Sequence, residues 1–183
     1  MSSQPQKTAD IAKVIAKRRE AVIARQETWA LVRRVLVLAV IAFFVLTQVF
    51  LIAQVEGLGM FPALKDGDLA LVYRLQKEFS RGDVVAYQAN GGRHFGRIIA
   101  QAGDEVTISE TGTLQVNSQL ESGEILFPTY SADGGAFRCV VPAGHVFLVG
   151  DYRPEMEDSR TFGSVPLSQV EGKLITLLRR RGL

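Results

Sequence analysis

Residues able to perform acid–base or metal chemistry are few in this sequence, and they lie apart from one another. The two histidines, His94 and His145, have no cysteine or second histidine at the spacing of a metal site, and we expect both to lie on strands. Most carboxylates stand close to glycine in turn-like segments such as KDGD and AGD. In such segments we expect Asp to stabilise the turn rather than to take part in catalysis. The sequence therefore predicts no bound metal and no cofactor.

The single cysteine, Cys139, excludes an intrachain disulfide. Its apolar neighbours Phe137, Val140 and Val141 indicate a small buried hydrophobe rather than a reactive thiol. The sequence has no phosphate-binding loop, and its second half does not combine basic patches with aromatic residues, so we expect no nucleic-acid partner. A net charge of +2 implies no particular partner for the chain as a whole.

One stretch of the chain is apolar enough to span a membrane. Residues 35–53 carry no charge and only two polar side chains, Thr47 and Gln48. As a helix, this stretch covers a hydrocarbon core of about 30 Å. It is longer than the apolar part of a cleaved signal peptide and follows 34 other residues. A buried core helix is the other alternative, but the remaining chain is too small to surround one, so we predict a transmembrane helix.

Charge predicts the orientation of this helix. The first 34 residues hold eight Lys or Arg against three Asp or Glu, whereas the next cation after Arg34 is Lys65. Positive residues remain on the cytoplasmic side. We therefore predict a basic helical cytoplasmic segment at 1–34, whose cations could also touch anionic lipid, a transmembrane helix at 35–53 and an extracytoplasmic domain at 54–183 of a cell-membrane protein.

Beyond residue 54 the sequence is typical of an all-β domain. Short runs rich in β-branched and aromatic residues alternate with turn signals such as RGD, NGG and SADGG. We expect strands at 69–75, 83–89, 93–101, 105–109, 113–117, 124–130, 136–141 and 145–151, followed by an amphipathic segment at 165–178. The predicted fold class is mainly β: a single N-terminal transmembrane helix followed by a β-rich domain.

Four segments, in a fixed order behind this anchor, resemble a known family. They read GLGMFPALKDGD (57–68), RGDVVAY (81–87), FGRIIAQAGDEV (95–106) and GDYRPEMEDSRTFGSVP (150–166). They are similar to the conserved blocks of bacterial type I signal peptidases (peptidase family S26), the membrane-bound serine proteases that remove signal peptides. The resemblance spans about residues 35–175 and implies the β-rich signal-peptidase domain.

The resemblance also implies where catalytic groups belong, and this chain lacks them. The family's nucleophilic serine falls on Gly59, its lysine base on Gly96 and its supporting hydroxyl on Met156. The serine that lends a hydroxyl to the oxyanion hole in many members falls on Gly57. Glycine offers neither an oxygen nor an amine, and attack by serine needs a nearby base.

Substitutes for these groups are scarce in the sequence. No lysine lies between Lys77 and Lys173, and Lys65 stands in a turn. His94 precedes Gly96 by two positions, whereas relatives with a histidine base place it directly before the arginine. The hydroxyl residues of the last block, Ser159, Thr161 and Ser164, stand where the family uses such residues structurally.

By resemblance, residues 54–59 and 92–96 flank an extended peptide and pair with its backbone. The predicted peptide-binding residues are Val55, Gly57, Leu58, Met60, Phe61, Pro62, His94 and Phe95. Residues 60–64 also suit shallow insertion into the outer leaflet or a local hydrophobic cluster. The predicted structural residues are Asp151, Arg153, Asp158, Ser159 and Arg160, with Asp158 and Arg160 as an ion pair near the Arg153 turn.

These features predict a pseudoenzyme, a membrane-anchored signal peptidase homologue without its dyad. Incomplete members of this kind occur beside sortase-built pili in Gram-positive bacteria. The resemblance therefore implies an assembly factor or chaperone whose partners are a signal peptide or pilin precursor, a sortase and the lipid bilayer. Two alternatives stay open: a signal peptidase that cleaves exported proteins with atypical catalytic residues, and a subunit that sequesters signal peptides without cleavage.

Overall fold

The computed structural model describes residues 4–121, 126–155 and 157–179, and for 4–24 it describes the backbone alone. Met156, where the family's supporting hydroxyl falls, lies outside the described residues. The chain divides into two units, Met1–Thr47 and Gln48–Leu183. The first is almost entirely one helix and the second is a β domain.

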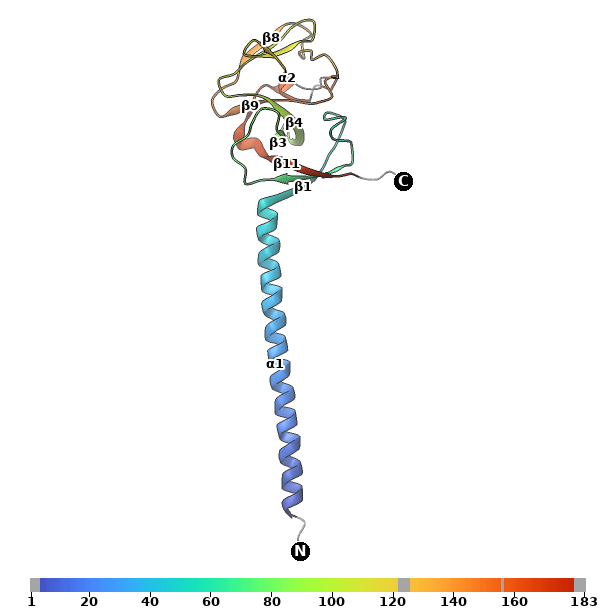
Figure 1. Ribbon diagram of the computed structural model, residues 1–183, viewed down its shortest axis with the longest axis vertical. Helices are drawn as coiled ribbons and strands as arrows, with labels where there is room; N and C mark the ends of the chain where they lie inside the picture. Colours follow the sequence, from blue (N-terminus) through green and yellow to red (C-terminus); the bar gives the residue numbers. More distant parts are fainter. Residues whose placement is uncertain (1–3, 122–125, 156, 180–183) are drawn as a thin grey trace. The chain divides into compact units, whose positions relative to one another are not determined.

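The helix α1 (Gln4–Val49) contains the predicted membrane anchor (Figure 1). Its portion Arg25–Val49 is long and apolar enough to cross a membrane, with a mean hydropathy of 2.3 in its most apolar window. None of that window is buried against other protein, so it is not the core helix of a soluble domain. Its exposed Leu, Val and Phe side chains fit a single-pass membrane anchor.

The helix ends before the predicted end of the span. We expected helix to Ala53, but Phe50–Gln54 forms strand β1, which pairs antiparallel with β2 (Leu69–Tyr73) from Phe50 opposite Tyr73 to Gln54 opposite Leu69. A continuous apolar run suits a buried helix and a strand equally, so hydropathy could not locate this change. Pairing with β2 satisfies the backbone of these five residues and decides the boundary.

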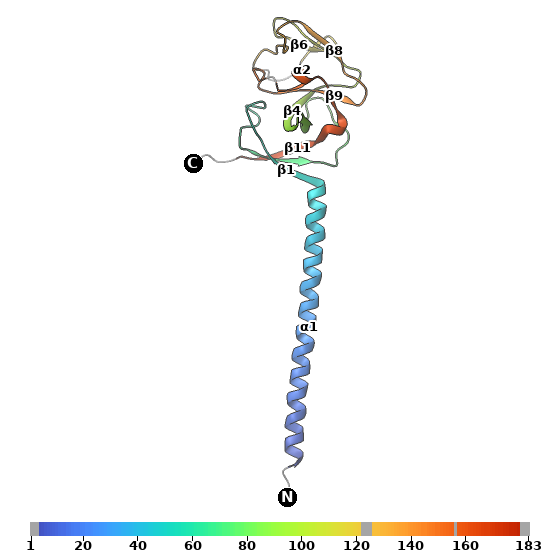
Figure 2. The same cartoon turned by 180° about the vertical axis from the view of Figure 1, so that it is seen from behind.

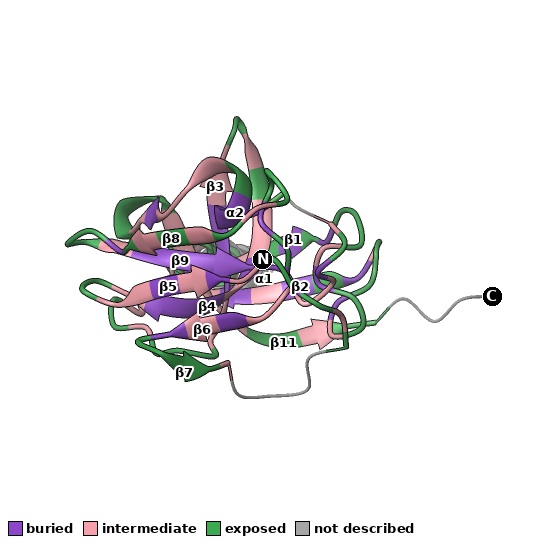
Figure 3. Cartoon of the chain, turned by 90° about the horizontal axis from the view of Figure 1, so that it is seen from above, coloured by how far each residue is buried: buried purple, intermediate pink, exposed green. Residues whose placement is uncertain are grey.

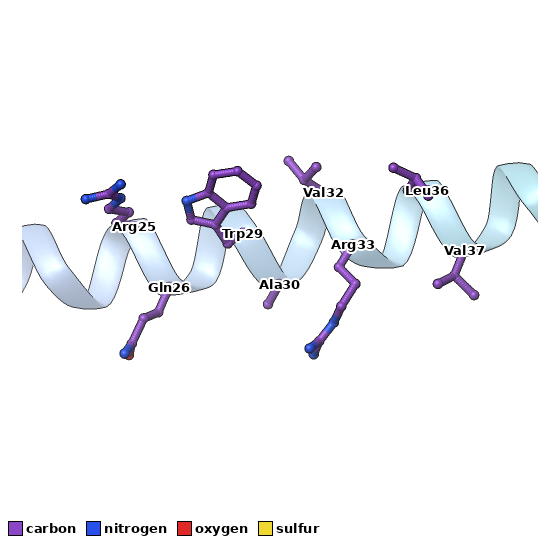
Figure 4. Close-up of a pocket in the computed structure, with 8 residues that line it drawn as sticks. All are labelled: Arg25, Gln26, Trp29, Ala30, Val32, Arg33, Leu36 and Val37. Carbon is purple, nitrogen blue, oxygen red and sulfur yellow. The ribbon is translucent and has the colours of Figure 1, made fainter.

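A shallow hollow on α1 has no enclosing partner. All residues around it come from one helix, and Figure 4 shows Arg25 and Trp29 on one side of that helix and Gln26 and Arg33 on the opposite side. Among the described residues, only those of α1 line it, and they enclose no cavity. Trp29 near flanking arginines is instead typical of a membrane interface.

A seven-stranded antiparallel sheet forms the main body of the β domain. Its order is β1-β2-β11-β3-β4-β9-β10, and all of its pairings are antiparallel. The added strands are β3 (Val84–Ala89), β4 (Gly92–Gln101), β9 (His145–Val149), β10 (Val165–Pro166) and β11 (Val170–Leu178). A short helix, α2 (Ser159–Phe162), and a 3-10 turn, η1 (Leu167–Gln169), precede β11.

A second sheet of four strands, ordered β7-β6-β5-β8, completes the domain. Its strands are β5 (Glu105–Ile108), β6 (Leu114–Val116), β7 (Gln119–Leu120) and β8 (Phe137–Val140). Figures 1 and 2 show β8 at one end of the domain and β1 and β11 at the other. The mainly β fold class is therefore confirmed.

Three apolar clusters hold the sheets together. One joins β4 and β9 to β5 and β6, a second packs the β1–β2 loop under β2, and a third covers β3, β4 and β9 beside α2. Figure 3 shows β9 almost wholly buried, in accord with four of its five residues. Strands β3 and β4 carry most of the second and third family blocks. Each contributes buried side chains to two of these clusters.

The strand expected at 124–130 is absent from its described part, 126–130. Phe127 there packs edge-to-face on Tyr152, with ring centroids 5.3 Å apart. Thr129 donates its N–H to the Gly112 carbonyl oxygen at 2.8 Å. Packing and the ring of Pro128 hold this segment as an irregular loop, although its composition favours a strand.

Candidate functional site

The first family block folds into a compact loop between β1 and β2. The Val55 N–H donates to the Asp68 carbonyl oxygen at 2.8 Å, and the Gly67 N–H donates back to the Val55 carbonyl oxygen at 2.9 Å. Met60 and Leu64 are 2% and 1% exposed and belong to the core under β2. These two residues are therefore unavailable for the lipid insertion considered from the sequence.

The outer side of the same loop carries the remaining apolar residues. Leu58 and Phe61 are exposed large hydrophobic side chains, and Pro62 is exposed beside them. The Phe61 ring packs edge-to-face on Tyr152 with centroids 6.3 Å apart. This contact ties the first family block to the last one.

Gly59 and Gly150 bring the two blocks into backbone contact. A Cβ on Gly150 would collide with the Gly59 carbonyl oxygen, which also accepts the Tyr152 N–H at 3.0 Å. Above the loop lies the Glu155 carboxylate. Its oxygen atoms would stand 3.4 Å from a Cβ on Gly57 and 3.9 Å from a Cβ on Gly59. Gly59 thus faces a carboxylate.

Gly96 is covered by an aromatic ring. It pairs with Val85 of β3, and Tyr87, two residues further along β3, crosses over it. A Cβ on Gly96 would lie 3.1 Å from Tyr87 Cε1 and 3.4 Å from Leu148 Cβ. The space that a side chain at this position would enter is therefore filled, chiefly by Tyr87.

The Tyr87 hydroxyl is an unusual feature of this region. Tyr87 is fully buried, and its hydroxyl has no hydrogen-bond partner among the described residues. Burial raises the pKa of this phenol well above its usual range, and the nearby negative charges of Asp158 and Glu157 raise it further. The hydroxyl therefore stays protonated at physiological pH and keeps unused hydrogen-bonding capacity.

A cavity of about 40 Å³ lies where the loop, β4 and the last family block meet. Its lining residues are Val55, Glu56, Gly59, Met60, Arg93, His94, Phe95, Gly150, Glu155, Glu157 and Asp158. Six predicted site residues meet there: Val55, Gly59, Met60, His94, Phe95 and Asp158. The other predicted peptide-binding residues, Gly57, Leu58, Phe61 and Pro62, do not line it, nor does Gly96.

His94 lies between the cavity and the core. Its Nδ1 is 4.0 Å from Glu157 Oε2, and its Nε2 is 3.1 Å from the Ala89 carbonyl oxygen. Its ring stacks at a tilt on Tyr87, with centroids 5.7 Å apart. The imidazole is thus held through Nε2 and against one face, and Glu157 lies beyond hydrogen-bonding distance of Nδ1.

The predicted structural residues form a buried network in the last block. Asp158 caps α2 and accepts the Gly150 N–H and the Arg160 N–H, both at 3.0 Å. Arg160 Nη2 meets Asp158 Oδ2 at 2.7 Å, and Arg160 Nη1 donates to the Arg153 carbonyl oxygen at 2.7 Å. Arg153 itself pairs with Glu121, Nη1 to Oε2 at 2.8 Å.

Asp151 and Ser159 have different partners. Asp151 pairs with Arg97 of β4 through two bonds of 2.8 Å and 2.6 Å. The buried Ser159 hydroxyl oxygen accepts the Leu148 N–H at 3.0 Å. Ser159 is therefore fixed to β9, away from solvent, and is a poor substitute nucleophile.

Sequence reasoning missed Tyr87, Glu155 and Glu157 as members of this region. The cluster of acidic residues in E-M-E-D (155–158) was a visible signal for the two glutamates. No sequence pattern indicates the Tyr87 contact, because this contact depends on the strand register that places Tyr87 opposite His94.

An apolar helix is followed in the chain by a β-rich domain, in which the four family blocks lie around β4. These features define the class of protein. Residues 28–178 match the family described as "Signal peptidase, peptidase S26". The chain belongs to this family, which confirms the resemblance drawn from its blocks.

Individual relatives are similar at moderate identity. The signal peptidase I of Bacillus caldolyticus is 28% identical over 166 residues, covering 82% of this chain and 88% of that protein. The mitochondrial ATP-independent inner membrane protease subunit 1b of Arabidopsis thaliana is 28% identical over 130 residues, covering 67% and 66%. A crystal structure of a signal peptidase I from Enterococcus faecalis V583 is 28% identical, covers 54% of this chain and 97% of that one, and has a TM-score of 0.46.

Proposed function

We propose that this protein binds an extended segment of an exported precursor, a signal peptide or a pilin precursor, without cleaving it. In this role it acts as a membrane-anchored assembly factor or chaperone, with a sortase of a Gram-positive pilus system as a further partner. The helix anchors it to the bilayer with its N-terminus in the cytoplasm and residues 54–183 outside. Family membership supports a peptide ligand and a membrane location.

The observation that carries the proposal is glycine at both dyad positions, Gly59 and Gly96. Acyl transfer by this family's chemistry needs an oxygen nucleophile and a base that accepts its proton. Gly59 and Gly96 supply neither, and the Glu155 carboxylate and the Tyr87 ring stand beside them instead. At Gly96 the space that a side chain would enter is already occupied by Tyr87, which favours a site that no longer holds a base there.

Lysines elsewhere do not supply the missing base. Lys65 is exposed in the β1–β2 loop, and Lys173 pairs with Asp83 at 2.6 Å. A lysine that acts as a base is activated by desolvation in an apolar pocket, and neither of these amines is buried. This supports binding rather than hydrolysis as the function.

An unpaired strand edge supports a peptide ligand. β4 pairs with β3 along its length from Gly92 to Arg97, but with β9 only from Arg97 to Gln101. The Gly92–Gly96 part of β4 therefore has no strand partner on its second side among the described residues. An extended peptide can pair with such an edge through main-chain hydrogen bonds, beside His94 and Phe95.

One assay tests the absence of cleavage. The detergent-solubilised full chain is incubated with a signal peptide and with a pilin-precursor peptide, a catalytically complete family member serving as the positive control. Mass spectrometry should find both peptides intact, while fluorescence anisotropy with the labelled peptides detects binding. Site-specific cleavage by the unmodified protein would overturn the proposal.

An atypical signal peptidase remains the second candidate, because His94 lies 4.0 Å from Glu157 at the cavity. This pair is the only histidine–carboxylate contact within 4.0 Å among the described residues. If cleavage occurs, His94→Ala and Glu157→Gln identify whether this pair is responsible. Loss of cleavage in both variants with unchanged peptide binding would establish the second candidate.

A further inference from the structure

One side of the seven-stranded sheet is apolar although it faces away from the core. Successive side chains of a strand point to opposite faces, and those of β1, β2 and β11 that point inward belong to the apolar cluster under β2. Large apolar side chains also point outward from these three strands and are strongly exposed: Ile52 (66%), Leu69 (41%), Ile175 (54%) and Leu178 (62%). We call this surface the outer face of β1, β2 and β11.

Strand register gathers these residues into one patch. Ile52 of β1 is opposite Leu71 of β2. Leu178 of β11 is opposite Leu69, the next outward position of β2. Ile175 lies at the register shift in β11, and its exposure places its side chain outside the core. A contiguous apolar patch of this kind marks an interaction surface, whereas single exposed apolar residues do not.

The chain connects this face directly to the apolar helix. α1 ends at Val49 and β1 begins at Phe50, so no linker lies between them. The Arg74 N–H, just after β2, donates to the Val49 carbonyl oxygen at 2.9 Å. Val49 also belongs to the same compact unit as the sheet. At about 3.3 Å per strand residue, Ile52 lies within about 10 Å of the last helical residue.

The length of the helix indicates where the bilayer ends. From Trp29, at one membrane interface, to Val49 the helix rises by about 30 Å at about 1.5 Å per residue. This rise matches the thickness of the hydrocarbon core, so the second boundary falls at the start of β1. There the rings of Phe50 and Tyr73 pack together with centroids 5.8 Å apart. Tyr is enriched at the level of the headgroups.

We propose that the outer face of β1, β2 and β11 lies against the surface of the bilayer, on the leaflet where α1 ends. Ile52, Ile175 and Leu178 enter the boundary between headgroups and acyl chains. Lipid is the occupant that the chain itself brings to this face, because the membrane boundary is within about 10 Å of Ile52. The β domain is therefore held on the membrane by the sheet face as well as by the helix. The inference rests on α1 as the proposed anchor and not on the binding of a peptide.

Fluorescence quenching by spin-labelled lipids tests this contact. The full chain, with Cys139→Ala to remove its own free thiol, is reconstituted at one copy per phosphatidylcholine nanodisc. Ile175→Cys or Leu178→Cys then carries the fluorophore NBD on the outer face. Lipids with a nitroxide at the headgroup or near the top of the acyl chain should quench both labels strongly.

Two further labels calibrate this result. Val140→Cys carries the label on β8 of the second sheet, where the native side chain is 60% exposed, and should be quenched several-fold less than the outer-face labels. Val40→Cys places the label inside the membrane-spanning part of α1. A nitroxide near the end of the acyl chain should quench this label most.

Paired substitutions connect the quenching to the native side chains. Ile52→Ser with Ile175→Ser makes the outer face polar without touching the core, so quenching of the Leu178→Cys label should fall several-fold. Leu120→Ser with Val140→Ser is the matched control, because it removes two exposed apolar side chains from the second sheet. It should leave the quenching of the Leu178→Cys label unchanged.

The outcomes separate the sheet face from the anchor. Equal quenching of the Ile175→Cys and Val140→Cys labels, with the Val40→Cys label quenched, overturns the lipid contact and leaves the anchor intact. An Ile175→Cys label that lipids do not quench, but that two copies per disc shield from aqueous iodide, overturns it in favour of a second copy of the chain. An unquenched Val40→Cys label overturns the anchor and this inference together.

Discussion

Tyr87 lies over Gly96, so that a Cβ added to the glycine would stand 3.1 Å from Cε1 of the ring. The two residues are on neighbouring strands, and the register that pairs Val85 with Gly96 places the ring diagonally across the glycine. Diagonal neighbours of this kind are within reach of aromatic side chains. Gly96 is thus part of a packed aromatic core.

Alanine substitutions at Gly96 and at Gly59 should differ in their effect on stability. Gly96→Ala must displace Tyr87 or Leu148, and overpacking of this kind costs about 1–3 kcal/mol. At Gly59 the nearest atoms are 3.9 Å from the new Cβ, so Gly59→Ala should change the free energy of unfolding by less than about 1 kcal/mol. Urea unfolding of the two variants measures the difference. Equal destabilisation would contradict the filled state of the Gly96 space.

Gly150→Ala should be more severe than either. The new Cβ would collide with the Gly59 carbonyl oxygen, and backbone moves less readily than a side chain. We expect a loss of about 3 kcal/mol. Gly135→Ala is the matched control, because no atom lies within 4 Å of a Cβ there. Thermal unfolding at matched protein concentration compares them, and a mild Gly150→Ala would show that the two blocks can separate.

Asp158→Asn should strongly destabilise the domain. Arg160 would retain a buried charge without its partner, since the two side chains are 4% and 0% exposed. Breaking such a pair costs about 3–5 kcal/mol. The exposed pair of Arg138 with Glu105 provides the comparison, and Glu105→Gln should cost no more than about 1 kcal/mol. Similar denaturation midpoints for the two variants would refute a structural role for Asp158.

The Arg93–Glu171 pair should make part of the stability dependent on pH. The hydrogen bond from Arg93 lowers the pKa of Glu171, burial opposes this, and Gln88 adds a second bond. A lowered folded pKa gives stability that is present above the unfolded pKa of about 4.3 and is lost as the pH falls through the folded value. Glu171→Gln should therefore destabilise the protein at pH 7 and much less at pH 3.

Unfolding free energies at both pH values test this, with Glu110→Gln as the control for an exposed glutamate. An equal effect of Glu171→Gln at both values would mean that the ionised pair contributes nothing beyond packing.

The location of each unit leads to a final prediction. If positive residues hold the N-terminus in the cytoplasm, protease added to intact cells stripped of their wall should degrade the β domain and spare an N-terminal tag. Detergent should then expose the tag. Loss of the tag before detergent is added would reverse the proposed orientation.

Much of the architecture followed from local sequence. Turn glycines and β-branched runs predicted seven of the strand regions, because they reflect backbone preference and alternation along the chain. Strands β1 and β7 were missed, and the amphipathic segment at 165–178 was not predicted to form strands β10 and β11. Pairing rather than composition makes these residues strands. The strand predicted at 124–130 was wrong in its described part, 126–130, because the packing of Phe127 and Thr129 overrode a strand-like composition.

In the candidate site, too, some features follow from the residue types and others only from tertiary contacts. The sequence by itself determined the family, the anchor and the absence of a side chain at Gly59 and Gly96, because these depend on residue type and order alone. Only the tertiary structure decided what stands in their place. Glu155 lies beside Gly59 where the first and last blocks meet, and Tyr87 of β3 lies over Gly96 of the neighbouring strand β4. Such contacts depend on strand register and backbone approach, which no local pattern encodes.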